Sequence, residues 1–319
     1  MIVRAAAVTA LLATAACTAA PPLPPRADAS PRTAPTRAEA GCGERRLPGG
    51  RHTFEHGGLT RTFLLSVPDG RGPHPVLLNL HGLGSDAREQ AAYTRLPREG
   101  AARGYIVATP QAADGRLAWT LPHSYGPDDT AFLGALLDHL EDGLCADRRR
   151  AFAAGLSYGG AMAVALVCGL RGRLAGAAAV GGVSLAPPCE RPPPATVVAV
   201  HGTADRVVPY QGGHPLREAT GDLRALADLV TLPPVTAVGR RWAAAYRCGP
   251  AAASSPASRV RLSAWTSCAG GAAVRLYTVK DGGHTWPGPV EVPRLGRTET
   301  GLDATRLLLD VFDRAPDRS

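Results

Sequence analysis

Residues 150–162, RAFAAGLSYGGAM, constrain the fold more than any other part of the chain. An apolar run leads into GLSYG at positions 155–159, a G-x-S-x-G pattern, and small residues that favour a helix follow. This order predicts a strand, a sharp turn and a helix, with Ser157 in a strained conformation that lifts its hydroxyl above a sheet. Glycine is needed two positions before and after the serine, because side chains there would collide as strand and helix close together. Ser157 is therefore the candidate nucleophile; the alternative is a glycine-rich turn before a packed helix.

Short apolar runs and helical segments alternate along most of the chain. The runs are typical of strands buried on both faces of a mostly parallel sheet, and they are residues 76–80, 105–109, 151–156, 175–180, 196–200 and 274–279. Before them, residues 51–54 and 59–67 are expected to form an antiparallel pair. Residues 128–144 carry leucines at helical spacing behind two aspartates expected to cap the helix, and residues 302–312 form a closing helix. This pattern predicts a doubly wound α/β fold, in one domain spanning residues 41–319.

The N-terminal sequence has the features of an export signal. It reads MIVRAAAVTALLATAAC, with one arginine, an apolar stretch too short for a comfortable membrane span, and small residues before Cys17. Ala15-Ala16-Cys17 resembles a bacterial lipobox, but Thr14 stands where Leu, Val or Ile is usual. Lipidation of Cys17 and ordinary cleavage nearby therefore both stay open for the signal, residues 1–17. Residues 18–40, rich in Pro and Ala, are expected to form a flexible tether.

Composition limits the classes of partner. The 319 residues are 45% hydrophobic and 19% charged, which is enough apolar material for one large core. The net charge of +8 comes from scattered arginines, so nucleic acid is not an expected partner. No two cysteines have C-x-x-C spacing, and neither a metal nor a cofactor is expected. We expect a monomer that reaches a membrane only through a lipid anchor on Cys17.

The cysteines are typical of an oxidised, exported domain. Of the seven, an even set of six remains when Cys17 is set aside. Cys248 and Cys268 bracket a segment rich in Ser and Ala, and they are expected to close a single surface excursion. The other expected pairs are Cys168–Cys189 and Cys42–Cys145.

A serine nucleophile needs a histidine to accept its proton and an acid to orient that histidine. In α/β-hydrolases these follow in the order serine, acid, histidine. His284 lies in a glycine-rich segment directly after the last predicted strand, so it is the predicted base. Asp205 follows the predicted strand 196–200, at the edge where ligands bind in open α/β sheets, so it is the predicted acid. Of the alternatives, His214 is expected to be a solvated loop residue and Asp281 a turn residue.

Acyl transfer also needs two backbone N–H groups that stabilise the oxyanion of the tetrahedral intermediate. One is expected from Tyr158, the residue after the nucleophile. The other is expected from Leu83, because the segment LHGLG at 80–84 follows the predicted strand 76–80. His81 in that segment is expected to be structural, since it precedes the nucleophile and ends a strand.

These segments, taken in order, resemble the secreted polyhydroxybutyrate depolymerase and feruloyl esterase family, which is grouped with the carbohydrate esterases that include acetylxylan esterases. The matching motifs are LHGLGSDA at 80–87, GPDDTAFLGALLD at 126–138, GLSYGG at 155–160, HGTADRVVPY at 201–210 and GGHTWPG at 282–288. The resemblance covers residues 42–312 and implies the α/β-hydrolase fold, with nucleophile, acid and base at Ser157, Asp205 and His284. Tyr158 stands where many relatives have Asn. A substrate-adhesion module is not seen after the domain, which argues against attack on crystalline polyester.

The expected function is an exported serine esterase, extracellular or on the cell surface, that cleaves carboxylic esters through an acyl-enzyme. Feruloyl or acetyl esters of plant polysaccharide are the favoured substrates, and short-chain polyester such as poly-3-hydroxybutyrate or its oligomers is the alternative. A non-catalytic binding protein on the same fold is the alternative of another class, but such a protein would be expected to lose a triad member. Trp286, two positions after His284, is expected to wall the acyl pocket; a core role for its ring is the alternative.

Overall fold

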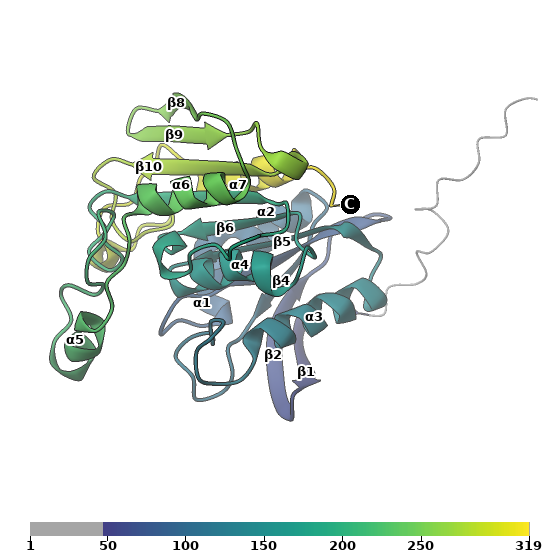
Figure 1. The fold of residues 1–319 in the computed structure, drawn as a ribbon. Helices are drawn as coiled ribbons and strands as arrows, with labels where there is room; N and C mark the ends of the chain where they lie inside the picture. Colours follow the sequence, from purple (N-terminus) through teal and green to yellow (C-terminus); the bar gives the residue numbers. More distant parts are fainter. Residues whose placement is uncertain (1–46, 319) are drawn as a thin grey trace, which may run out of the picture.

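A ten-stranded sheet runs through the part of the chain that this computed structural model describes, residues 47–318 (Figure 1). Its strand order is β1-β2-β4-β3-β5-β6-β7-β10-β9-β8. The central strands from β4 to β10 pair in parallel, and antiparallel pairs lie at both edges. The strands are β1 (Gly50–His56), β2 (Leu59–Ser66), β3 (His74–Leu80), β4 (Ile106–Pro110), β5 (Ala146–Leu156), β6 (Gly176–Val180), β7 (Thr196–Gly202), β8 (Ala252–Ala257), β9 (Val260–Trp265) and β10 (Ala273–Val279).

Helices cover both faces of this sheet. Helices α3, α4 and α6 pack on one face, whereas α2 and α7 pack on the other, and α5 lies apart from the sheet (Figure 1). The helices are α1 (Ala87–Thr94), α2 (Leu96–Ala102), α3 (Asp129–Gly143), α4 (Tyr158–Gly169), α5 (Gly221–Asp228), α6 (Val235–Ala245) and α7 (Ala304–Asp313), with 3-10 turns η1 (Val183–Leu185), η2 (Ala269–Gly271) and η3 (Pro293–Leu295).

The apolar runs are continuous because successive residues of a strand enter two different cores. In β7, Val197 and Ala199 pack in the core under α4, whereas Val198 and Val200 pack in the core under α7. A strand covered on both faces has no exposed side on which polar residues could alternate. The predicted fold class and the predicted antiparallel start, now β1 and β2, are therefore confirmed.

The segment between Cys248 and Cys268 differs from the expected surface excursion. It forms the antiparallel hairpin β8–β9, and β9 pairs with β10, so the segment extends the sheet. The Cys248–Cys268 disulfide closes this hairpin at its base, as predicted.

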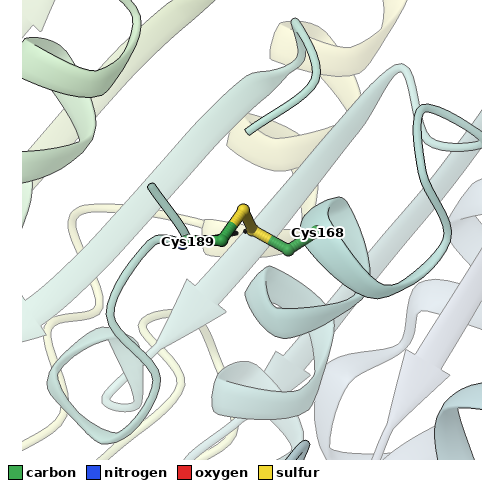
Figure 2. The surroundings of a disulfide bond; sticks show 2 residues. All are labelled: Cys168 and Cys189. Atoms are coloured by element: carbon green, nitrogen blue, oxygen red, sulfur yellow. Dashed lines mark hydrogen bonds between the residues drawn. A yellow bond between two sulfur atoms is a disulfide. The ribbon is translucent and has the colours of Figure 1, made fainter. Parts of the chain in front are cut away.

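A second disulfide, Cys168–Cys189, joins the end of α4 to the segment before β7, which confirms another predicted pair (Figure 2). Cys145 is also disulfide-bonded. Its predicted partner Cys42 lies outside the described residues, as do the predicted export signal and tether.

The two aspartates at the start of α3 have different roles. Asp128 caps the helix as predicted, because its carboxylate accepts the backbone N–H of Ala131 at 2.9 Å. Asp129 instead is buried and forms an ion pair with Arg61 at 2.7 Å, while its second oxygen accepts the N–H of Thr120. Only tertiary contact between β2 and α3 brings that arginine to the helix terminus.

Candidate active site

The residues predicted to carry the chemistry follow neighbouring strands at one edge of the sheet. Leu83 follows β3, Ser157 follows β5, Asp205 follows β7 and His284 follows β10. Because β3, β5, β6, β7 and β10 are consecutive in a parallel sheet, their carboxyl ends meet at one edge. Residues as far apart in the sequence as Leu83 and His284, which are separated by 201 positions, are thereby brought to one edge.

Ser157 occupies a strained turn between β5 and α4. Its backbone has φ 56° and ψ −122°, a conformation that is costly for a residue with a side chain. Two hydrogen bonds maintain it: the N–H of Ser157 donates to Val180 at 2.7 Å, and its carbonyl accepts the N–H of Ala161 at 3.0 Å. The surrounding structure therefore holds Ser157 at the start of the helix in a strained backbone conformation.

The glycines on either side of Ser157 are required by close backbone contacts. A Cβ atom on Gly159 would collide with the carbonyl oxygen of Leu80, and a Cβ on Gly155 would lie 2.7 Å from the same atom. Gly82 also approaches the nucleophile, since a Cβ there would lie 3.3 Å from the Cβ of Ser157. The loop after β3 and the serine turn are thus packed against each other without intervening side chains.

Asp205 and His284 form a buried hydrogen-bonded pair. The Nδ1 of His284 lies 2.7 Å from Oδ2 of Asp205, and both side chains are at least 95% buried. The other carboxylate oxygen accepts the backbone N–H groups of Val207 and Val208, each at 2.8 Å. Because Nδ1 faces a carboxylate it carries the proton, which leaves Nε2 of His284 as an acceptor.

A second histidine contacts the same carboxylate. The Nε2 of His201 lies 3.3 Å from Oδ2 of Asp205 and 2.8 Å from the carbonyl oxygen of Val208. Both neighbours are acceptors, so the proton of His201 resides on Nε2. Burial by itself raises the pKa of Asp205, but hydrogen bonds from His201 and His284 outweigh it and hold the pKa well below its ordinary value. Asp205 is therefore a carboxylate throughout the neutral range.

Gly181, at the end of β6, leaves room for this pair. It has φ 63°, and a Cβ atom there would lie 3.1 Å from Nδ1 of His284 and 3.6 Å from Oδ2 of Asp205. A side chain would therefore displace the histidine from its carboxylate. Neither Gly181 nor His201 was predicted from the sequence as part of the site.

The two backbone groups predicted for the oxyanion lie beside the nucleophile. The N–H groups of Leu83 and Tyr158 have no hydrogen-bond partner within residues 47–318. Tyr158 is the first residue of α4, where an N–H group has no acceptor in its own helix. Both groups are therefore available to a ligand oxygen.

A supporting loop holds the segment that contains Leu83. The N–H of Gly84 donates to Leu117 at 2.8 Å, and Nε1 of Trp119 donates to the carbonyl of His81 at 2.9 Å. The buried ring of His81 donates from Nδ1 to Gly82 and accepts the N–H of Ala112 at Nε2. Burial lowers the pKa of His81, which keeps the ring neutral and able to accept that bond. His81 thus has the structural role expected of it.

Ser157 and His284 line one cleft of about 460 Å³. Its apolar lining consists of Leu83, Leu156, Val207, Leu216, Val290, Val292 and Leu295, with Tyr93 at the wall formed by α1. Two charged side chains, Glu89 and Arg294, also line the cleft, together with the polar residues Ser85 and Gln90. The cleft thus combines an aliphatic interior with the serine, the histidine and two charges.

Trp286 is not part of the cleft wall, and this corrects the predicted role in the acyl pocket. Its ring is 2% exposed, packs in the core under α7 and donates its indole N–H to Thr305 at 3.0 Å. Burial of so large an apolar ring, with its one polar group satisfied, favours the core position. The backbone N–H of Trp286 is a separate donor, and it donates to the phenol oxygen of Tyr93 at 2.9 Å.

Tyr93 lines the cleft and was missed in the sequence. The available signal was the pattern D-x-x-E at Asp86 and Glu89, which is typical of a helix start. Asp86 does cap α1, and Glu89 and Tyr93 lie one turn apart on the face that lines the cleft. Of the other predicted residues, His214 is exposed, and Asp281 lies in a turn with φ 56°, paired with Arg259.

Residues 47–318 contain neither a cluster of metal ligands nor a helix suited to span a membrane. No group of three or more His, Cys, Asp or Glu side chains in this range could hold a metal ion. Within the same range, no helix has the length and apolarity needed to cross a membrane.

Several known proteins resemble this chain in sequence or in fold. The chain is 31% identical over 343 residues to "Putative esterase NocK" of Nocardia uniformis subsp. tsuyamanensis, covering 95% of this chain and 96% of that protein. It is 28% identical to feruloyl esterase B of Piromyces equi over 66% of this chain, but spans only 39% of that protein. The acetyl xylan esterase from Aspergillus awamori shares the fold, with TM-score 0.54, 14% identity, and coverage of 74% of this chain and 94% of that one.

No family model matches the chain. The NocK relative aligns over nearly the full length of both chains, and feruloyl esterases B and D align over 66% and 60% of this chain. The sheet order and the helix-covered faces agree with that relationship. The chain belongs to the α/β-hydrolase esterase family.

Proposed function

We propose that Ser157, Asp205 and His284 form a catalytic triad that hydrolyses carboxylic esters through an acyl-enzyme. The observation that carries the proposal is the 2.7 Å bond from Nδ1 of His284 to Asp205, made in a cleft that Ser157 also lines. That bond leaves Nε2 of the histidine free to accept the serine proton.

The first half of the reaction is acylation. The Oγ of Ser157 attacks the ester carbonyl carbon while Nε2 of His284 accepts the hydroxyl proton, and the carbonyl oxygen becomes an oxyanion near the N–H groups of Leu83 and Tyr158. Collapse of this intermediate breaks the bond between the carbonyl carbon and the alcohol oxygen, and this oxygen takes up the proton that His284 accepted from Ser157. The alcohol leaves, and the acyl group stays on Ser157.

The second half is hydrolysis of the acyl-enzyme. Water attacks the acyl carbon and gives a proton to Nε2 of His284, and collapse returns that proton to the Oγ of Ser157 as the carboxylic acid leaves. Asp205 stays a carboxylate in both halves and stabilises the imidazolium, in keeping with its lowered pKa, which hydrogen bonds produce against the opposing effect of burial.

The substrates we propose are feruloyl or acetyl esters of plant polysaccharide. Relatives described as feruloyl esterases support the first, and an acetyl xylan esterase of the same fold agrees with the second. Tyr93 in the cleft wall supplies an aromatic surface that suits a feruloyl ring. The alternative is short-chain polyester such as poly-3-hydroxybutyrate oligomers, which the aliphatic lining of the cleft favours.

We further propose that the protein is exported and acts as a monomer. The two disulfides support an oxidising compartment.

If Cys17 is lipidated, residues 18–40 act as a spacer between membrane and domain. Wild-type protein should then partition into detergent, and Cys17→Ser should release it or block its processing. Recovery of the wild type wholly in culture supernatant with an unmodified N-terminus would instead establish simple secretion.

A substrate panel tests the reaction and its specificity together. It comprises 4-nitrophenyl esters of increasing acyl length, methyl ferulate, acetylated xylan and soluble hydroxybutyrate oligomers. Highest kcat/KM on methyl ferulate or acetylated xylan supports the polysaccharide ester, and highest kcat/KM on the oligomers supports the polyester alternative. Absence of turnover on every ester would refute the esterase and favour a binding protein.

A further inference from the structure

Arg294 places a positive charge at the cleft without an acidic partner. Its side chain lines the cleft and forms no ion pair or hydrogen bond with any residue of the described range 47–318. Nearby Arg297 behaves differently, because its guanidinium lies 3.3 Å from the carboxylate of Glu299 and also donates to the carbonyl of Lys280. Arg294 is exposed, so its guanidinium is accessible both to water and to a ligand in the cleft.

The turn that carries Arg294 is attached to the predicted catalytic base. Arg294 lies in η3, and the carbonyl of the next residue, Leu295, accepts the backbone N–H of His284 at 2.7 Å. The N–H of Gly283 donates to the carbonyl of Arg297 at 2.8 Å, so two bonds join the turn to the histidine loop. The base of the Arg294 side chain is thereby held in a constant position relative to His284.

Tyr93 adds a neutral donor to the same wall. Its phenol oxygen accepts the backbone N–H of Trp286, and this bond leaves the phenol proton available as a donor. Burial raises the pKa of Tyr93, which keeps the phenol protonated, while the nearby charge of Arg294 acts in the opposite direction. The phenol and the guanidinium thus line the same cleft, where both can contribute to binding one ligand.

The acid in the cleft has partners of its own. Glu89 accepts the hydroxyl of Ser85 at 2.8 Å and lies in the first turn of α1, where the helix N-terminus stabilises negative charge. Glu89 thus has a hydrogen-bond partner among residues 47–318, whereas Arg294 has none. The cleft therefore complements a ligand that carries a negative group.

We propose that Arg294, assisted by the Tyr93 phenol, binds a free carboxylate on the substrate, so that the preferred esters are those with an anionic group in the acyl or the alcohol part. The proposal rests on the esterase function above and adds the charge of its substrate. A guanidinium and a phenol O–H together offer the forked, charge-assisted hydrogen bonds that a carboxylate accepts. An ester of an acidic sugar or a half-ester of a dicarboxylic acid has this chemistry.

The test compares matched neutral and anionic esters in wild type and two variants. The acyl-side pair is 4-nitrophenyl butyrate and mono-4-nitrophenyl glutarate, and the alcohol-side pair is phenyl acetate and 4-acetoxybenzoate. Arg294→Gln should lower kcat/KM for the anionic member of at least one pair by about tenfold, as loss of a charged hydrogen bond predicts. The neutral members should change by less than about twofold, because they make no such bond.

Arg297→Gln is the matched control, since it removes the same charge from the same segment but does not line the cleft. It should leave the ratio of anionic to neutral kcat/KM unchanged. High salt should reduce that ratio in wild type more than in Arg294→Gln. Equal effects of the two variants, or an unchanged ratio in Arg294→Gln for both pairs, would overturn the proposal.

Binding to an inactive variant separates this inference from the esterase function. With Ser157→Ala, calorimetry on mono-4-nitrophenyl glutarate should give a dissociation constant that rises about tenfold when Arg294→Gln is added. Turnover of neutral esters without this difference would leave the function standing and refute the role of Arg294. A tenfold change in the dissociation constant without turnover of any ester would support the role of Arg294 and refute the esterase function.

Discussion

The Nε2 of His201 lies 3.3 Å from Oδ2 of Asp205, so the carboxylate that faces His284 is also held by a second imidazole. The His201 ring is fully buried, and its Nδ1 has no partner among the described residues. The ring therefore contacts Asp205 and Val208 through Nε2 alone. His201 is thus a positioning residue for Asp205.

Replacing His201 should reduce turnover without weakening substrate binding. His201→Leu removes the donor to Asp205 and Val208 and should lower kcat by about tenfold with KM nearly unchanged, because the carboxylate loses a hydrogen bond. His201→Gln can place an N–H near the same oxygens and should recover much of the loss. Steady-state kinetics decide, and equal losses in the two variants would point to packing alone.

Ser157→Ala should abolish ester hydrolysis and leave the fold intact. Loss of the nucleophile should lower kcat by at least about 10³-fold, leaving only background catalysis by the rest of the site. The midpoint of thermal unfolding should stay close to that of wild type, since only a hydroxyl is removed. Ser254→Ala, on the exposed strand β8, is the control and should keep full activity. More than a few per cent residual rate would reject Ser157.

Asp205→Asn should change both activity and the pH dependence of stability. Its amide cannot fix the histidine tautomer, so kcat should fall by about 10³-fold to 10⁴-fold. Hydrogen bonds lower the pKa of Asp205 against burial, so the unfolded chain binds a proton before the folded one does. The wild type should therefore gain stability from Asp205 above about pH 4, the ordinary carboxyl range, and lose it as the pH falls below that range.

Urea unfolding of both proteins between pH 6 and pH 3 tests the second effect. The free energy of unfolding should fall more steeply with acid in wild type than in Asp205→Asn. Parallel curves would mean that the carboxylate has the same pKa in the folded and unfolded chain.

Breaking the buried pair of Arg61 and Asp129 should destabilise the domain strongly. Arg61→Met leaves Asp129 as an uncompensated buried charge and should cost about 3–5 kcal/mol of unfolding free energy. The double variant Arg61→Met/Asp129→Asn removes that charge and should recover part of the loss. Arg206→Met, which breaks an exposed pair with Glu218, should cost less than about 1 kcal/mol. Chemical unfolding measures the stability of all three variants. A double variant with a lower free energy of unfolding than Arg61→Met would contradict this account.

The Cys248–Cys268 disulfide should stabilise the edge of the sheet. Replacing both cysteines with Ala should lower the free energy of unfolding by about 2–4 kcal/mol, because a closed loop restricts the unfolded chain. Hydrogen exchange should become faster in β8 and β9 before it does in β6 or β7. Unchanged stability, or free thiols at both positions in the purified protein, would refute the role of the bond.

The serine turn and the main strands could be predicted from the sequence because they are local. The glycines around Ser157 and the apolar run before them specify strand, turn and helix within about a dozen residues, at a scale where sterics suffice. The same holds for β7, whose apolar run needs only to be covered on both faces. The order of serine, acid and histidine then indicated which Asp and His to consider.

Tertiary structure decided which side chains enter the cleft. The sequence places Trp286 beside His284, but the ring packs under α7, where Thr305 satisfies its N–H, and Tyr93 from α1 lines the cleft instead. The contact between Asp205 and His284, which lie 79 residues apart in the sequence, likewise depends on the order of the strands in the sheet. The ion pair between Arg61 and Asp129 also forms only when distant segments pack together. Sequence by itself determined the local backbone and the types of residue available; the packing of distant elements decided which of them meet, because burial free energy depends on neighbours that are far apart in the chain.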